Sequence, residues 1–302
     1  MLKTLEENVK NILVSENFNN METNKIINGN CIEVMKTMTE SSIDLLVTSP
    51  PYGVGIQYDV HEDDMIFEDY LKFTREWLTQ AYRVMKDDGR VAINIPYEIN
   101  RQDKGGRIFF VSEVWNIMKE VGFKFFGIVD LEEDSPHRSK TTAWGSWMSP
   151  SSPYIYNPKE CVILAYKNKH IKKVKGQPQW EGKVMDIEQE DGSIKKKTVY
   201  AEEDKKDFMD LVFGQWKYLN DSRPLTKATF SMDIPTKAIK ILSYKNDIVL
   251  DPFAGSGTSL VAAEILGRRW IGIELSPNYT EVAIKRVQMF IDDKKIEFEK
   301  EV

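Results

Sequence analysis

The chain has 302 residues with 41 Lys and Arg against 47 Asp and Glu, which gives a formal net charge of −6. Its composition, 41% hydrophobic and 29% charged, is that of a folded globular protein. The acidic balance argues against a protein that coats nucleic acid without sequence preference, because such binding depends on Lys and Arg. No apolar run approaches the roughly 20 residues that cross a bilayer, and the N-terminus lacks the features of a secretory signal. We therefore expect a cytoplasmic protein.

Cysteine and histidine are scarce. Only Cys31 and Cys161 are present, far apart and outside any CxxC pair. The prediction is two buried free thiols. His61, His137 and His170 show no metal-ligand spacing, so no metal site is expected.

The first half of the chain alternates strand and helix patterns. Residues 2–14 have the apolar spacing of a short amphipathic helix. The following elements are expected as strand 25–29, helix 31–38, strand 43–49, helix 67–86, strand 90–96, helix 110–122, strand 123–131 and strand 160–167. This alternation predicts a mostly parallel α/β sheet with helices on both faces.

The pattern is interrupted before it returns. Residues 169–223 show little periodicity, many charges and scattered aromatics, which indicates an insertion or a small recognition module. A compact unit follows, with helix 234–243, a strand ending at residue 251, helix 258–267, strand 269–275 and helix 276–291.

The segment "VTSPPYG", residues 47–53, follows a short, continuous apolar strand. Two consecutive prolines end the strand, because proline has no backbone N–H and a fixed φ. They also form a rigid frame that can present Ser49 and Tyr52 to a ligand.

A second motif, "VLDPFAGSGTSLVAAEILGRRWIGIEL" at 249–275, has the pattern of a nucleoside-binding βαβ unit. Glycines let the turn approach a ligand closely, and an acid that ends the second strand can accept hydrogen bonds from ribose hydroxyls. The turn lacks both the GK[ST] ending of a P-loop and the third glycine of a dinucleotide fingerprint. S-adenosyl-L-methionine (AdoMet) fits, whereas the alternative is a βα turn with incidental glycines. The candidate cofactor residues are Asp251, Phe253, Gly255, Ser256, Gly257, Thr258 and Glu274.

Together, "TSPPYG", "DPFAGSGT" and "GIELSPNY" resemble the exocyclic-amino DNA methyltransferases, which modify N4 of cytosine or N6 of adenine. The catalytic motif precedes the cofactor motif, as in the circularly permuted β class. The resemblance implies an AdoMet-dependent methyltransferase (Rossmann-like) fold with a seven-stranded, mostly parallel sheet. It also implies an N-terminal extension (1–25), a catalytic half (26–167), a target-recognition region (168–223) and an AdoMet-binding half (224–302), in which residues 228–239 help to close over AdoMet.

The chemistry of amino-group methylation gives a reason for two consecutive prolines. An exocyclic amino group is a poor nucleophile until acceptors pull it toward tetrahedral geometry. Ser49 Oγ and the carbonyl of Pro50 can be those acceptors, and Pro51 helps to fix that carbonyl before the substrate arrives. Tyr52 can stack on the flipped-out base, and the alternative is that it packs in the core.

Two features depend on the resemblance. Family members with serine before the prolines mostly act on cytosine, and those with aspartate or asparagine on adenine, so cytosine N4 is expected and adenine N6 is the alternative. The family's adenine-binding aspartate in "GDxLEVL" is replaced here by Asn30, whose amide can still donate and accept.

Two segments are candidate DNA contacts. The loop 135–158 contributes Arg138, Lys140, Trp144 and Trp147, and the lysine-rich stretch after it contributes Lys172, Lys173 and Lys175. The competing interpretations are tryptophans that cover a sheet edge and lysines on a solvated surface. The expected partner is double-stranded DNA, and a cognate restriction endonuclease and a homodimer are both compatible with the sequence.

Two other functions are compatible with the motifs. PPY motifs also serve the methylation of RNA bases and of protein glutamine, but the long insertion favours a DNA-reading module. A non-catalytic scaffolding subunit is disfavoured because Ser49, Tyr52, Asp251 and Glu274 are all intact.

Overall fold

The computed structural model describes residues 22–53, 65–133, 145–146, 148–153, 155, 157–189, 193–219 and 231–301. The predicted helix over 2–14 lies outside these ranges. Among the described residues, no helix is long and apolar enough to span a membrane.

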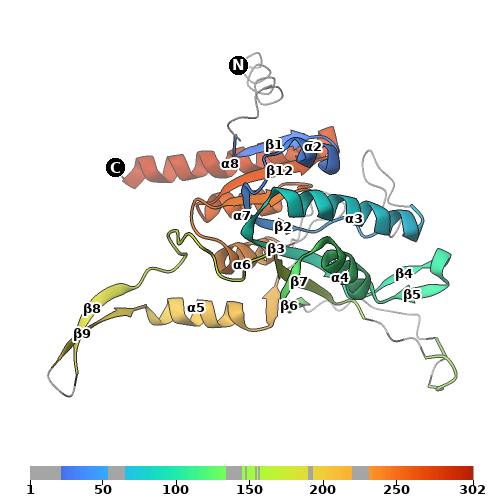
Figure 1. Cartoon of the computed structure of the whole chain (residues 1–302), viewed down its shortest axis with the longest axis horizontal. Coiled ribbons are helices and arrows are strands. Elements are labelled where there is room, and N and C mark those ends of the chain that lie inside the picture. The colour runs from blue at the N-terminus through green and yellow to red at the C-terminus, as the bar shows by residue number, and fades with distance from the viewer. Residues whose placement is uncertain are drawn as a thin grey trace, which may run out of the picture.

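A large mixed sheet organises the described part of the chain (Figure 1). Its strands lie in the order β1 (Lys25–Asn28), β12 (Arg269–Glu274), β11 (Ile248–Asp251), β2 (Ile43–Thr48), β3 (Met85–Pro96), β7 (Glu160–Tyr166), β6 (Lys124–Glu133) and β10 (Gln215–Tyr218). Of these strands only β7 runs antiparallel to its neighbours. The mostly parallel sheet is confirmed, with eight strands rather than seven because β10 adds to its edge beside β6.

Helices cover both faces of the sheet, as the alternating pattern predicts. One layer consists of α2 (Cys31–Thr37), α3 (Phe67–Val84) and α4 (Phe110–Val121), and the other of α6 (Asp233–Leu242), α7 (Thr258–Ile265) and α8 (Pro277–Glu301). The apolar run of strand β2 is continuous because both faces of the strand are buried. Leu46 packs into the first layer, whereas Leu45 and Val47 pack into the second.

The predicted thiols and most predicted element ends are confirmed. Cys31 and Cys161 are both buried and free, and burial raises each thiol pKa to about 12. Two boundaries differ by more than two residues. Helix α8 continues to Glu301 rather than ending at residue 291, and the "DDG" that was expected to separate helix α3 from a strand lies inside β3. Ile43 pairs with Met85 and Leu45 with Arg90, so residues 86–89 bulge from the ladder.

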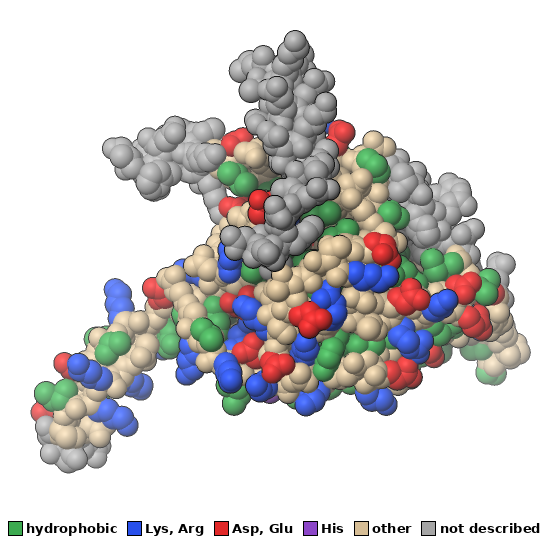
Figure 2. All heavy atoms as spheres, turned by 45° about the horizontal axis from the view of Figure 1, so that its top comes forward, with side chains coloured by type: hydrophobic (Ala, Val, Ile, Leu, Met, Phe, Trp, Pro, Cys, Tyr) green, Lys and Arg blue, Asp and Glu red, His purple; other side chains and the backbone are tan. Residues whose placement is uncertain are grey.

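The segment after β7 is more regular than its sequence suggests. It contains the hairpin β8 (Lys183–Glu188) and β9 (Ile194–Val199), the helix α5 (Glu202–Val212) and strand β10. The hairpin extends away from the central sheet and carries hydrophobic and lysine side chains on its surface (Figures 1 and 2). A second short hairpin, β4 (Ile99–Arg101) and β5 (Gly106–Ile108), precedes α4.

Candidate active site

The two sequence motifs meet at the end of the sheet where its parallel strands have their carboxyl termini. Strands β1, β12, β11 and β2 are consecutive neighbours and mutually parallel, so their carboxyl ends align. Asn30 follows β1, Glu274 ends β12, Asp251 ends β11, and Ser49 follows β2. Open α/β sheets bind ligands at this edge.

The Ser-Pro-Pro-Tyr turn is held in place by its neighbours. The hydroxyls of Ser49 and Tyr52 are hydrogen-bonded over 2.8 Å, and either can donate. The ring of Tyr52 meets Phe110 edge-on, with centroids 6.2 Å apart. Tyr70 of α3 donates its hydroxyl to the carbonyl of Pro51 over 3.0 Å.

The carbonyl of Pro50 is not used in the same way. Within the described part of the chain, no group donates a hydrogen bond to it, although Pro50 itself is buried. Gly53 has a φ of 69°, and a Cβ there would come within 2.9 Å of the Tyr70 ring. The turn is therefore fixed on α3, and the Pro50 carbonyl is a remaining acceptor beside the Ser49 hydroxyl.

Asp251 connects the two motifs. Its Oδ1 accepts from Thr48 Oγ1 over 2.7 Å and from the backbone N–H of Phe253 over 3.0 Å, and its Oδ2 accepts from Ser259 Oγ. The side chain is fully buried, and burial raises its pKa to about 6. Asp251 was expected to bind the cofactor directly, but its side chain is fully buried and its carboxylate is directed at donors of the protein. It fixes the residue before Ser49 against the start of the glycine turn.

The glycine turn leaves space for a ligand at one position only. Gly255 has a φ of 53°, and a Cβ added there would meet nothing within 4 Å. Gly257, with a φ of 80°, is different because its Cβ would come within 3.1 Å of the Ala283 side chain. Gly255 thus provides an open approach for a ligand, whereas Gly257 permits close packing of the turn against α8.

Glu274 is positioned by two backbone donors. Its Oε2 accepts from Gly255 N and its Oε1 from Ser276 N, both over 2.8 Å. Burial raises its carboxyl pKa. Because a carboxylate oxygen can accept a second hydrogen bond, the group retains capacity for ribose hydroxyls. The open space at Gly255 and this oriented acid fit a nucleoside ligand.

Asn30 is exposed and caps helix α2. Its Oδ1 accepts from Ile32 N over 2.9 Å and from Glu33 N over 3.4 Å. The amide that replaces the family's aspartate thus has a structural role, and the residue lies at the same edge of the sheet as the other candidates.

Three other predicted cofactor residues point into the protein. Ser256 and Thr258 are buried, and their hydroxyls accept from the Arg286 guanidinium over 3.1 and 2.9 Å. Phe253 packs edge-on against Trp77, with centroids 5.3 Å apart. The side chains of Ser256 and Thr258 therefore support the turn from behind. Arg286 was not among the predicted site residues, because nothing in the sequence distinguishes it from the exposed basic residues of the same helix.

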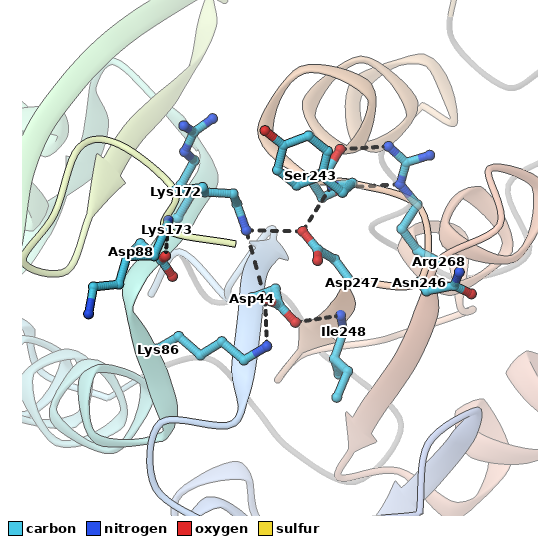
Figure 3. Close-up of polar contacts among 12 residues, drawn as sticks. Asp44, Lys86, Asp88, Lys172, Lys173, Ser243, Asn246, Asp247, Ile248 and Arg268 are labelled. Atoms are coloured by element: carbon cyan, nitrogen blue, oxygen red, sulfur yellow. Dashed lines mark hydrogen bonds and ion pairs between the residues drawn. The ribbon is translucent and has the colours of Figure 1, made fainter. Parts of the chain in front are cut away.

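Two of the lysines predicted to contact DNA lie among acids near the amino ends of the strands: Figure 3 shows Lys172 beside Asp44 and Asp247, and Lys173 beside Asp88. Lys172 is 8% exposed, and its ammonium is 3.0 Å from Asp247 and 3.9 Å from Asp44, at the amino ends of β11 and β2. The backbone N–H of Lys173 donates to Asp88 over 2.7 Å. Lys172 is therefore committed to a buried ion pair. Lys173 and Lys175 are exposed but belong to the same segment, away from Ser49.

The other predicted DNA contacts, Arg138, Lys140, Trp144 and Trp147, lie outside the described residues. The β8–β9 hairpin, which the structure does describe, carries exposed lysines at positions 183 and 195–197.

Comparisons with known proteins agree with this geometry. Residues 43–285 match the model of a DNA methylase family. The type II methyltransferase M.MjaVI of Methanocaldococcus jannaschii is 37% identical over 166 residues, which cover 55% of this chain and 82% of that protein. M.HpaI of Haemophilus parainfluenzae is 26% identical over 273 residues, which cover 87% and 74%.

Two solved structures share the fold. The cytosine-N4-specific PvuII DNA methyltransferase has a TM-score of 0.62 at 17% identity, covering 90% of this chain and 91% of that one. A Thermus thermophilus protein solved with S-adenosyl-L-methionine has a TM-score of 0.61 at 22% identity, covering 88% and 93%. On the family match over residues 43–285, the chain belongs to the DNA methylase family, whose members methylate exocyclic amino groups in DNA.

Proposed function

We propose that this protein transfers a methyl group from AdoMet to the N4 amino group of a cytosine in DNA. The observation that carries the proposal is the Ser49–Tyr52 turn, held beside the glycine turn through Thr48 and Asp251. Ser49 and the glycine turn follow adjacent parallel strands, β2 and β11, which supports a base acceptor next to a cofactor site.

The residues that would hold AdoMet lie around the open position at Gly255. Gly255 lets the ligand approach the backbone, Glu274 accepts from the ribose, and Asn30 borders the adenine. When bound, AdoMet supplies an electrophilic methyl group on a sulfonium centre. The protein's task is to place an amino nitrogen opposite that methyl group.

Ser49 and Pro50 prepare the nucleophile. If Ser49 donates its proton to the Tyr52 hydroxyl, both lone pairs of its Oγ are available to an amino N–H, and the donated bond makes Oγ a better acceptor. The Pro50 carbonyl accepts the second N–H. Both acceptors are fixed in advance, so little ordering is left for the substrate. The nitrogen gains the methyl group and loses one proton, which leaves to water because neither acceptor is basic enough to keep it.

Tyr52 supplies a surface for the flipped base. Tyr52 packs edge-on against Phe110 and remains partly exposed. A half-exposed aromatic ring next to the amino acceptors is suited to stack on an extruded base.

Cytosine is preferred over adenine on the identity of residue 49. Serine precedes the prolines here, whereas aspartate or asparagine precedes them in most adenine-specific relatives. Adenine N6 presents the same two amino protons and is the alternative substrate.

The β8–β9 hairpin is proposed as a DNA-contacting element. In an antiparallel pair, directly opposed residues lie on the same face. Met185 opposes Lys197 and Ile187 opposes Lys195, and Lys183 belongs to this same face, which carries no acid. The other face includes two acids. The lysine face therefore suits phosphate. The loop residues Arg138, Lys140, Trp144 and Trp147 remain proposed contacts.

The test is to incubate the protein with labelled AdoMet and unmodified DNA of varied sequence, and then to digest the DNA to nucleosides. The label is expected in N4-methylcytosine. Label in N6-methyladenine would overturn the base assignment, and no label in DNA would overturn the activity. Ser49→Ala is expected to abolish methyl transfer while AdoMet still binds, and Ser112→Ala, at a partly exposed position of α4, serves as its control.

A further inference from the structure

Arg286 makes three contacts with the glycine turn. One guanidinium nitrogen lies 2.9 Å from Thr258 Oγ1, 3.1 Å from Ser256 Oγ and 3.4 Å from the carbonyl of Ser256. Both hydroxyl-bearing residues are buried, at 2% and 3% exposure. Ser256 and Thr258 are the neighbours of Gly257, which has a left-handed backbone conformation. A single residue of α8 therefore holds the turn on both sides of Gly257.

A second contact from α8 supports the same turn. Ala283 is one helical turn before Arg286, and its Cβ lies 3.1 Å from the position that a Cβ at Gly257 would take. Residues three apart on a helix share a face. Thus Ala283 limits how closely the turn can approach α8, and Arg286 fixes the orientation of the Ser256 and Thr258 hydroxyls.

The start of α8 is attached to the site independently. Glu274 accepts from Gly255 N with one oxygen and from Ser276 N with the other. Ser276 in turn accepts from the backbone of Tyr279 and Thr280 in the first turn of the helix. The acid, the open Gly255 position and α8 therefore form one connected unit, with Arg286 at its far end.

We infer that Arg286 is a positioning residue for the cofactor, which preorganises the Gly255–Thr258 turn from behind without touching AdoMet. This inference rests on the proposed function, because it concerns the same cofactor site. A flexible turn would have to be ordered when AdoMet binds, and that cost would lower affinity. Once the cofactor is bound, the geometry around Ser49 is unchanged, so methyl transfer at saturation should be nearly normal.

The test compares Arg286→Met, Arg286→Lys and a matched control, Lys285→Ala. Lys285 is the preceding residue, with a side chain 78% exposed and a loose pair to Glu281 at 3.8 Å. AdoMet binding is measured by calorimetry, and methylation is measured across AdoMet concentrations. We expect Arg286→Met to weaken AdoMet binding about ten-fold and to raise its KM equally, with kcat changed less than about three-fold. Arg286→Lys should give an intermediate loss, because an ammonium can also donate to both hydroxyls but lies on a shorter side chain than the guanidinium nitrogen that now contacts them. Lys285→Ala should match the wild type.

A mutant cycle separates positioning from general damage. Thr258→Val removes one partner of Arg286, so the losses from Thr258→Val and Arg286→Met should not add in the double variant. If Arg286→Met folds poorly, the Arg286→Lys and Thr258→Val pair provides the same cycle. Additive losses, or AdoMet affinity unchanged in Arg286→Met, would overturn the inference. Failure of the wild-type protein itself to bind AdoMet would instead overturn the proposed function.

Discussion

The hydrogen bond from Thr48 to Asp251 can be tested by Thr48→Val, which replaces a hydroxyl with a methyl group of similar size. The two atoms are 2.7 Å apart, and the residues are 1% and 0% exposed. Water therefore cannot replace the lost donor. A hydrogen bond to a charged, buried acceptor contributes about 1.5–3 kcal/mol. We expect a loss of about 2 kcal/mol in the free energy of unfolding at neutral pH, or about thirty-fold in the folding equilibrium.

Thr74 provides a matched control. It is 1% exposed, like Thr48, but within the described part of the chain its buried Oγ1 has no hydrogen-bond partner. Thr74→Val is the same chemical change without a bond to lose. It should alter stability by less than about 0.5 kcal/mol, or stabilise the protein, because an unsatisfied hydroxyl is removed.

Urea unfolding of both variants, followed by tryptophan fluorescence, measures the difference. The loss in Thr48→Val should shrink at pH 4.5, where Asp251 is protonated and a neutral carboxyl accepts more weakly. Equal losses for Thr48→Val and Thr74→Val would refute the role given to this bond. A methylation assay should show a lower kcat for Thr48→Val only, since Ser49 is the next residue.

Three further predictions concern charge. The pKa of Asp251 is about 6 when folded and about 3.9 when unfolded, so its contribution is fully present below pH 4 and falls by about 3 kcal/mol as the pH rises through 6. Urea unfolding of Asp251→Asn should therefore lack this part of the pH dependence, and an unchanged slope would contradict it. Lys172→Met should lower stability by about 3 kcal/mol, because it removes the ammonium paired with the mostly buried Asp247, whereas Asp44 keeps its pair with Lys86; DNA affinity in a mobility-shift assay should be unchanged. Lys195→Glu, on the lysine face of the hairpin, should weaken DNA binding by at least about ten-fold and flatten its salt dependence. The same change at Lys196, on the opposite face, should have a smaller effect, and equal effects would exclude a one-sided contact.

The elements that position the site were predictable because their signals are local. Strand β11 is a short apolar run that ends in a motif, and the prediction that it stops at Asp251 is confirmed. The same holds for β12, which ends at Glu274. Buried strands need only continuous hydrophobicity and a turn residue to be recognised.

The roles of Arg286 and Lys172 were not predictable, since they depend on partners distant in sequence. Arg286 bonds to a residue 30 positions earlier, and Lys172 bonds to one 75 positions later. A basic residue in an amphipathic helix or a lysine-rich stretch is usually solvated. Only the folded arrangement shows which one turns inward.

The β8–β9 hairpin was missed for a different reason. Strand recognition relies on hydrophobic and polar residues alternating between a core face and a solvent face. Every residue of β8 is exposed, and so is all of β9 except its last, partly buried residue. With no core face, the period of two is hidden among lysines and acids. A segment without a core usually serves a partner, which agrees with the DNA-contacting role proposed for it.

The catalytic and cofactor strands are joined at both ends, and this explains how motifs about 200 residues apart keep a fixed geometry. At the amino ends, Asp44 of β2 accepts from Ile248 N of β11 over 3.0 Å. At the carboxyl ends, Thr48 donates to Asp251. A slip of one residue would move Ser49 by about 3.3 Å along the strand and turn it to the other face. Because each end is fixed by a buried carboxylate, such a slip would take one hydrogen-bond donor from each of two buried charges. The register on which methyl transfer depends is therefore specified by polar contacts, since the apolar side chains of β2, buried on both faces, would fit either register.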